Sequence, residues 1–250
     1  MLNTGRVIFN KRINDEIRHL RIAVSPRFSA MPGQFINIRV SDGYSPLLRR
    51  PFSVFDHKKG MVDVVYRIIG EGTKKLSEKI KGDKIDFIGP AGNSYIDFLP
   101  DTDVPVCLVA GGTGFASIHF FAKWLDERKI KFRLFYGARN KKELIPDNFR
   151  NSGVFIFTDD GSYGKKGLVT DFLKKGKIKN SVIFCCGPKA MIKAVSKIKA
   201  VKKFASFESY MGCAIGVCLS CVVKIKKDRD FDYLRACQDG TVFDLDKVIF

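Results

Sequence analysis

The sequence has few histidines, a single tryptophan and no long apolar segment. The three histidines among its 250 residues, His19, His57 and His119, lie far apart and accompany no serine triad or carboxylate pair, so we expect packing or surface roles for them. No apolar run approaches the roughly 18 residues that a membrane-spanning helix needs. The first residues, Met1–Arg6, are polar and lack the apolar part of a secretory leader. These absences predict a cytoplasmic protein without membrane spans.

Acidic residues are scarce relative to basic ones. The chain has 44 basic and 26 acidic residues, which gives a formal net charge of +18. Such a charge suits nucleic acid, an anionic membrane surface or an acidic protein partner. However, the lysine pairs are spread along the chain with acidic residues between them, and no nucleic-acid-binding motif accompanies them. The sequence therefore predicts a solvated basic surface, with neither nucleic acid nor membrane as a partner.

Cysteine is plentiful, and four of the seven cysteines lie in the last forty residues. Cys213, Cys218 and Cys221 form a C-x4-C-x2-C loop, and Cys237 follows. This spacing is typical of the ligands of a plant-type [2Fe-2S] cluster. A zinc site is one alternative, although zinc ribbons usually supply two separated cysteine pairs, and disulfides or inert thiols are another. Seven cysteines without a leader also fit a reducing compartment, where thiolates can bind metal.

The first third of the chain has the pattern of an antiparallel barrel. Short alternating runs rich in β-forming residues are separated by turn signals, and one short helix is predicted at Thr73–Ile80. The predicted strands are Arg6–Lys11, Ile17–Val24, Gln34–Val40, Pro51–Phe55, Met61–Ile69 and Lys84–Ile88. Six strands at this spacing indicate a six-stranded antiparallel barrel.

After Pro100–Pro105 the pattern changes to buried strands that alternate with helices, which predicts a parallel sheet covered on both faces. The predicted strands are Val106–Ala110, Phe132–Tyr136, Val154–Phe157 and Val182–Cys185, and the predicted helices are Phe115–Arg128, Leu168–Lys175 and Lys189–Lys199. We therefore expect a barrel domain at residues 1–98, an α/β domain at 99–205 and a small cysteine-bearing unit at 206–250.

Two segments of the α/β region carry possible nucleotide chemistry. Gly111, Gly112 and Gly114 lie between a strand and a helix, where backbone N–H groups can bind a pyrophosphate, although the glycines could equally permit only a tight turn. Cys186, at the end of another buried strand, is placed to contact a nicotinamide. A buried, inert Cys186 is the alternative, and Cys185 should point the opposite way.

The barrel carries a third segment, Arg49–Ser53. Its second arginine can bind a pyrophosphate, Phe52 can offer an aromatic face, and Ser53 can hydrogen-bond a ring edge, although an ordinary strand start would look the same. Further along, Val65–Arg67 leads to Gly70–Thr73, a second potential anion site at a helix start.

The order of these motifs is more specific than any one of them. R-P-F-S, Y-R-x-x-G-x-G-T, G-P-x-G-N, G-G-T-G, Y-G-A-R, D-D-G-S-x-G-x-K-G and C-G-P precede the cysteine loop in that order. Over essentially its whole length, the chain thereby resembles the ferredoxin reductase-like flavoproteins. Within them, it is most similar to the electron transfer subunits of class 1B dihydroorotate dehydrogenases.

The resemblance implies three cofactors and assigns residues to each. For FAD it implies Arg50, Pro51, Phe52 and Ser53, then Val65, Tyr66 and Arg67, and finally Gly72 and Thr73. For NAD it implies Gly111, Gly112, Gly114, Cys186, Gly187 and Pro188, and for the [2Fe-2S] cluster Cys213, Cys218, Cys221 and Cys237. Phe52 replaces a tyrosine common in the superfamily, and Ser117 stands where many relatives have proline.

The implied function is electron transfer in pyrimidine biosynthesis, from an FMN-containing catalytic subunit through the cluster and FAD to NAD. An FMN barrel would need roughly 250 residues of its own, so a separate partner subunit must supply it. One alternative is a related reductase subunit of a hydrogenase, a sulfide-linked reductase or a transhydrogenase. A zinc-stapled basic binding protein is an alternative of another class. Arg139 could accept the 2′-phosphate of NADP, but the resemblance favours NAD.

Overall fold

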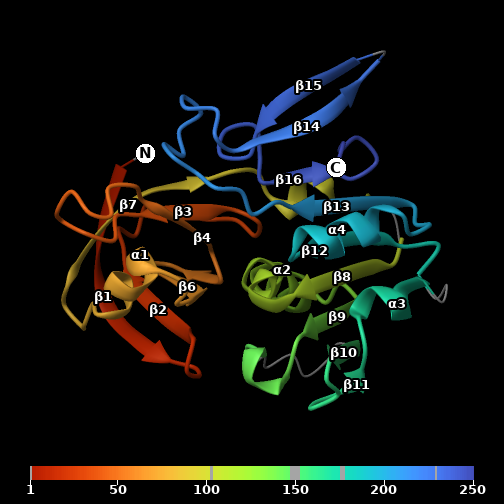
Figure 1. The fold of residues 1–250 in the computed structure, drawn as a ribbon, viewed down its shortest axis with the longest axis horizontal. Helices are drawn as coiled ribbons and strands as arrows, with labels where there is room; N and C mark the ends of the chain where they lie inside the picture. Colours follow the sequence, from red (N-terminus) through yellow and green to blue (C-terminus); the bar gives the residue numbers. More distant parts are fainter. Residues whose placement is uncertain (1, 102–103, 147–152, 175–177, 229) are drawn as a thin grey trace.

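The fold consists of two seven-stranded sheets and a two-stranded hairpin (Figure 1). The computed structural model describes residues 2–101, 104–146, 153–174, 178–228 and 230–250. Within this part of the chain, no helix is both long and apolar enough to span a membrane.

The first sheet is a curled antiparallel half-barrel with edge strands β4 and β5. Its order is β4 (Arg50–Ser53), β3 (Phe35–Ile38), β7 (Lys84–Ala91), β1 (Leu2–Arg12), β2 (Ile17–Ala23), β6 (Met61–Arg67) and β5 (Asp56–Lys58). All six predicted strands are present. The additional β5 has only three residues, Asp-His-Lys, and so carries no readable alternation. Helix α1 spans Glu71–Ser77, slightly earlier than predicted.

The second sheet is parallel except for its last strand. Its order is β11 (Lys165–Lys166), β10 (Gly153–Thr158), β9 (Phe132–Ala138), β8 (Val106–Gly111), β12 (Val182–Cys186), β13 (Lys202–Ser206) and β16 (Val242–Asp244). The four predicted strands are present, and β11, β13 and β16 are additional. The chain runs outward from β8 to β9 and β10, then returns to the other side of β8 with β12. The carboxyl ends of β8 and β12 therefore form the topological switch point where such sheets bind ligands.

Helices cover both faces of this sheet, as expected. Helix α2 (Phe115–Glu127) packs on the face that includes Cys186, whereas α3 (Val169–Lys174) and α4 (Lys189–Ser196) pack on the face that includes Cys185. The predicted helix end at residue 175 lies outside the described residues. Short 3-10 helices span Tyr95–Phe98, Gly112–Gly114 and Lys141–Glu143.

The C-terminal segment is joined to both larger sheets. It forms the hairpin β14 (Val222–Lys227) and β15 (Asp230–Arg235), which was not predicted, and then β16, which pairs antiparallel with β13. The α/β sheet is thus completed by residues from beyond the cysteine loop. The domain limits at residues 98 and 205 stay a prediction.

Helix α2 also holds the two larger domains together. The ring of His119 stacks on Phe55 at 3.8 Å, and Nδ1 lies 3.0 Å from the Phe55 carbonyl oxygen. Lys123 Nζ forms an ion pair with Asp56 at 2.5 Å. Burial lowers the pKa of His119 to about 4, so its imidazole is neutral at pH 7. His119 therefore packs at the domain interface, as predicted.

Candidate functional site

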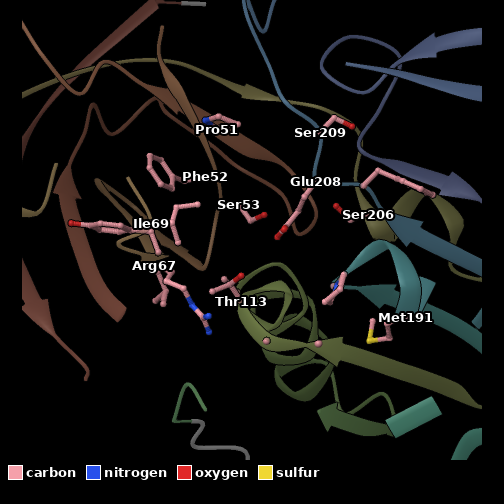
Figure 2. A pocket seen from close by; sticks show the side chains of 18 of the residues that line it. Pro51, Phe52, Ser53, Arg67, Ile69, Thr113, Met191, Ser206, Glu208 and Ser209 are labelled. Atoms are coloured by element: carbon pink, nitrogen blue, oxygen red, sulfur yellow. The ribbon is translucent and has the colours of Figure 1, made fainter. Parts of the chain in front are cut away.

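A single large cleft of about 1260 Å³ brings the predicted motifs together (Figure 2). Its walls are strands β4 and β6, helix α1, the glycine turn after β8, the end of β12 and the segment after β13. These elements come from the half-barrel, the α/β domain and the C-terminal segment. The cleft lies at the carboxyl ends of β8 and β12, where the sheet topology predicts a ligand site.

The aromatic side chains on the half-barrel wall are firmly held. Phe52 is 8 % exposed and packs against Tyr66, with ring centroids 5.4 Å apart. The Tyr66 hydroxyl donates to Asn10 Oδ1 at 3.1 Å, and burial raises the pKa of this phenol to about 12. Ser53 and Pro51 also line the cleft. This wall offers fixed apolar faces with a hydroxyl beside them, which fits a flat ring such as a flavin.

Arg50 and Gly72 lie next to each other on the same wall. Arg50 Nη1 donates to the Leu48 carbonyl at 2.6 Å, and a Cβ at Gly72 would lie 2.9 Å from Arg50 Nε. Thr73 Oγ1 accepts hydrogen bonds from the N–H groups of Ile69 and Gly70, so its hydroxyl caps α1. The guanidinium thus lies against the start of α1, as a pyrophosphate site requires. The individual FAD contacts of these residues stay a prediction.

Arg67 carries the clearest unsatisfied group in the cleft. Its Nη2 lies 3.3 Å from Glu143 Oε2, whereas its Nε is buried and has no hydrogen-bond partner among the described residues. A buried N–H without an acceptor is costly, and a ligand in the cleft can provide one. The residues of this wall therefore fit a bound cofactor with polar groups, such as FAD.

The glycines of the opposite wall have two different roles. Gly112 has φ +52°, and no atom lies within 4 Å of the position of a Cβ there, so its backbone faces open space in the cleft. At Gly114 a Cβ would lie 2.4 Å from the carbonyl oxygen of Cys186. Gly111 and Gly187 likewise pack closely against each other and Met191. Of these four glycines, Gly112 is the one whose backbone is open to a phosphate.

Cys186 lies behind this wall and does not line the cleft. Its side chain is fully buried on the α2 face of the sheet, and burial raises the pKa of its thiol. Cys185 points to the other face, as predicted from strand alternation. The contact between Cys186 and a nicotinamide stays a prediction; in this structure the thiol has the packing role that was its alternative.

Glu208 is a cleft residue that the sequence analysis missed. It follows β13, and its exposed side chain points into the cleft, where the surrounding walls desolvate the carboxyl group and raise its pKa (Figure 2). Ser206 and Ser209 lie beside it in the chain and are also labelled on the cleft wall. Recognising Lys202–Ser206 as a strand would have placed Glu208 at the edge of the sheet. This strand, β13, was not predicted, because its pairing partners are far away in sequence.

The four predicted cluster ligands form two pairs. Cys213 and Cys218 lie together, with each backbone N–H 3.4 Å from the sulfur of the other. Cys221 and Cys237 are hydrogen-bonded neighbours, and the N–H of Gly216 donates to Cys237 Sγ at 3.2 Å. Among the described residues, no three His, Cys, Asp or Glu side chains converge as ligands of one metal ion. The backbone N–H groups directed at these sulfurs fit an iron-sulfur cluster, whose sulfurs accept such hydrogen bonds.

The cysteine loop borders the cleft. Tyr210, Met211, Gly212 and Ser220 line the cleft, and a Cβ at Gly212 would lie 3.1 Å from Cys218 Sγ. Hydrogen bonds from Ser220, then Cys213, lower the pKa of Cys218 to about 6. Two predicted ligands, Cys213 and Cys221, thus directly follow cleft-lining residues in the chain.

The guanidinium of Arg139 forms an ion pair with Glu143. Its Nη2 lies 2.5 Å from Glu143 Oε1, and the N–H of Asp159 bonds to the Ala138 carbonyl, so a second carboxylate lies close by. The pKa of Glu143 is lowered by its hydrogen bonds to Arg139 and Arg67, which outweigh the opposing effect of burial. The guanidinium that could donate to a 2′-phosphate is thus already paired with a carboxylate.

Comparison with known proteins agrees with this geometry. Residues 208–249 match the family described as "Iron-sulfur cluster binding domain of dihydroorotate dehydrogenase B", and residues 108–197 match "Oxidoreductase NAD-binding domain". The dihydroorotate dehydrogenase B (NAD(+)) electron transfer subunit of Fusobacterium nucleatum is 40% identical over 220 residues, covering 85% of this chain and 84% of that protein. This chain belongs to that family.

Other relatives extend the match to the whole chain. The same subunit of Caldanaerobacter subterraneus is 34% identical over 250 residues, 98% of both chains. A chain of the NADH-dependent reduced ferredoxin-NADP oxidoreductase is 30% identical, with a TM-score of 0.83 over 98% of this chain and 89% of that one. The ferredoxin NADP+ reductase of Neisseria gonorrhoeae, solved with FAD and NADP, shares the fold at 15% identity, with a TM-score of 0.66 over 77% of this chain and 88% of that one.

These findings confirm several predictions made from the sequence. The chain is a member of the family that it resembled, its fold is that of the ferredoxin reductase-like flavoproteins, and it is an oxidoreductase subunit. The cofactor set of FAD, an iron-sulfur cluster and NAD is also confirmed. The assignment of individual residues to these cofactors stays a prediction.

Proposed function

We propose that this chain is the electron transfer subunit of a dihydroorotate dehydrogenase, carrying electrons from an FMN-containing catalytic subunit to NAD. The observation that carries this proposal is that residues predicted for the FAD and NAD sites meet the cysteine loop at one cleft. Arg50 and Phe52 line it from the half-barrel, Gly112 from the nucleotide turn, and Gly212 from the cysteine loop. FAD supplies the link when bound, because it exchanges hydride with a nicotinamide and single electrons with a cluster.

The role of the protein in this process is placement. The Phe52 and Tyr66 rings hold a flat apolar surface, and Arg50 and Arg67 supply donors for the charged part of FAD. Gly112 allows a second phosphate group to approach the backbone from the opposite wall. The half-barrel wall would hold FAD and the glycine turn would hold NAD, so these residues bind and orient the two cofactors.

The exposed cysteine loop supports docking of the catalytic subunit beside the cluster. Ile215, Val217 and Leu219 lie between the ligands and are 53%, 74% and 60% exposed. An apolar patch at this position suits a protein partner, and it brings that partner close to the cluster. We therefore expect a hetero-oligomer with the FMN-containing catalytic subunit. All seven cysteines are free, which supports the expected cytoplasmic location.

The test uses the purified chain with FAD and cluster, alone and after addition of the FMN-containing catalytic subunit. The chain alone should oxidise NADH with ferricyanide and show no dihydroorotate oxidation. The complex should reduce NAD with dihydroorotate. Cys218→Ser should abolish this transfer while NADH still reduces the flavin, and Cys185→Ala, a buried thiol outside the loop, should leave the cluster content unchanged. Dihydroorotate oxidation by the isolated chain would contradict the proposal.

A second candidate is the corresponding subunit of an NADH-dependent ferredoxin-NADP oxidoreductase. The observation in its favour is the 30% identity to a chain of that enzyme over 98% of this chain. Affinity purification from the native cell distinguishes the two candidates. An FMN-containing dihydroorotate-oxidising partner supports the first, and a partner that reduces ferredoxin with NADPH supports the second.

A further inference from the structure

The G-P-x-G-N motif at residues 89–93 contributes no group to the cofactor sites described above. Its last residue, Asn93, lies between β7 and the 3-10 helix Tyr95–Phe98, where the half-barrel meets the C-terminal segment. Asn93 Nδ2 donates to the Val242 carbonyl at 2.9 Å, and Asn93 Oδ1 accepts from the Val242 N–H at 2.8 Å. One side-chain amide thus satisfies both backbone groups of a residue 149 positions away.

The residues before Val242 are fixed to the half-barrel as well. The buried Thr241 Oγ1 donates to the Gly33 carbonyl at 2.8 Å. Gly240 has φ +130°, and a Cβ there would lie 2.3 Å from Asn93 Nδ2. A glycine is therefore required for the chain to pass this close to the Asn93 amide. We call these five residues, Gly33, Asn93, Gly240, Thr241 and Val242, the Asn93 junction.

The junction adjoins both the cleft and, in sequence, the last predicted cluster ligand. It begins three residues after Cys237, and Thr241 itself lines the cleft. Val242 is the first residue of β16 and pairs with Ser206, another cleft residue. The junction therefore connects the half-barrel, the α/β sheet and the last cluster ligand at one point.

We propose that Asn93 is a positioning residue for electron transfer: with Thr241 it fixes the cluster-bearing segment on the half-barrel and so sets the distance between FAD and the cluster. This inference rests on the proposed function. Electron transfer between two centres slows steeply as their separation grows, whereas hydride transfer from NADH to FAD takes place inside the cleft. Loosening the junction should therefore slow the first process and spare the second.

The electron balance defines the assay. NADH gives a hydride, which carries two electrons, to the flavin and is released as NAD. Each [2Fe-2S] cluster accepts one of these electrons, and the other stays on the flavin, so the assay needs no added oxidant. Under anaerobic conditions, stopped-flow absorbance follows flavin reduction and cluster reduction separately in the holoprotein.

Asn93→Ala should slow cluster reduction several-fold, because the rate of electron transfer falls steeply as the separation between FAD and the cluster grows. Flavin reduction by NADH should stay at the wild-type rate. Amide hydrogen exchange at Val242, a readout independent of activity, should become faster because its N–H loses its acceptor. Thr241→Val, which keeps the side-chain shape and removes only the bond to Gly33, should produce the same changes to a smaller degree.

Asn14→Ala is the matched control. Asn14 also joins two domains through its side-chain amide, since Nδ2 donates to the Lys142 carbonyl at 2.6 Å, but it lies in the β1–β2 turn, away from the C-terminal segment (Figure 1). This variant should leave cluster reduction and Val242 exchange unchanged.

Two outcomes would overturn the inference in different ways. Faster Val242 exchange with wild-type cluster reduction, in Asn93→Ala and Thr241→Val, would show that the junction does not set the transfer distance and would leave the proposed function intact. A wild-type protein whose flavin is reduced by NADH while its cluster stays oxidised would overturn both the inference and the proposed function.

Discussion

Individual cleft residues differ in whether their polar atoms are already used by the protein. The Tyr66 hydroxyl is bound to Asn10, and the Thr73 hydroxyl caps α1. Arg67 Nε has no acceptor within the described part of the chain. Because an unused buried donor gains most from a ligand, the arginines should contribute more to cofactor affinity than the hydroxyls. The same sequence motif thus contains residues with ligand roles and residues with structural roles.

Arg50→Ala tests the arginine contribution directly. It removes a charge-assisted contact that is worth roughly 1.5–3 kcal/mol, so the FAD dissociation constant should rise about tenfold or more. Titration of the apoprotein with FAD, followed by flavin fluorescence, measures this change. Arg39→Ala is the control, because Arg39 also lies on the half-barrel but bonds only to Ser41 and Asp42 carbonyls and is outside the cleft. Equal FAD affinity in Arg50→Ala and wild type would mean that the strand does not bind FAD.

Among the secondary-structure elements, helix α2 belongs to the α/β domain and also contacts the half-barrel. Its first turn follows the glycine turn, and its middle carries the His119 and Lys123 contacts to the half-barrel. One helix therefore places the nucleotide turn relative to the flavin wall. Its burial makes this arrangement sensitive to pH, because protonation of His119 inside the interface is unfavourable.

The pH dependence has a defined sign and window. The pKa of His119 falls from 6.5 in the unfolded chain to about 4 in the folded one, so the unfolded chain binds the proton more readily. The contribution of neutral His119 to the free energy of unfolding, about 3 kcal/mol, is complete above pH 6.5 and is lost as the pH falls toward 4. Urea unfolding between pH 4 and pH 7 should therefore show a shallower pH dependence in His119→Phe than in wild type. Identical pH dependences would exclude His119 as the cause.

At the scale of the whole molecule, the C-terminal segment is part of the α/β core. Phe243 on β16 is buried with Cys185 and Ala205 of the neighbouring strands, so the sheet and the cluster unit share one apolar cluster. Loss of packing in β16 should therefore destabilise both the α/β sheet and the cluster unit. This coupling explains how a 45-residue unit with an exposed loop keeps a fixed position beside the cleft.

Phe243→Ala tests this coupling. Large-to-small changes of buried phenylalanines cost about 3 kcal/mol or more, so thermal unfolding of the α/β domain should shift to lower temperature and cluster release should shift with it. Circular dichroism and cluster absorbance measure the two events. Phe231→Ala is the control, since this ring lies on the exposed hairpin and its loss should cost less than about 1 kcal/mol. Cluster release that is unaffected by Phe243→Ala would show an independent unit.

The sequence by itself determined most strands and the cysteine loop, because each rests on local order, whereas FAD and NAD followed from the order of the motifs along the chain. The spacing of Cys213, Cys218 and Cys221, the glycine turn after β8 and the alternation in the half-barrel can all be read within about ten residues. Motif order along the chain added the family. Strands β5 and β11 were not predicted, because two or three polar residues carry no periodic signal.

Only the tertiary structure decided which residues face the cleft and what joins the domains. Cys186 lies behind the wall and Glu208 on it, because the orientation of each depends on packing between strands that are distant in sequence. Asn93 bonds to Val242 across 149 positions, a contact that no local pattern reveals. Such contacts form only when the two sheets and the C-terminal segment assemble, so they follow from the fold and not from any one segment.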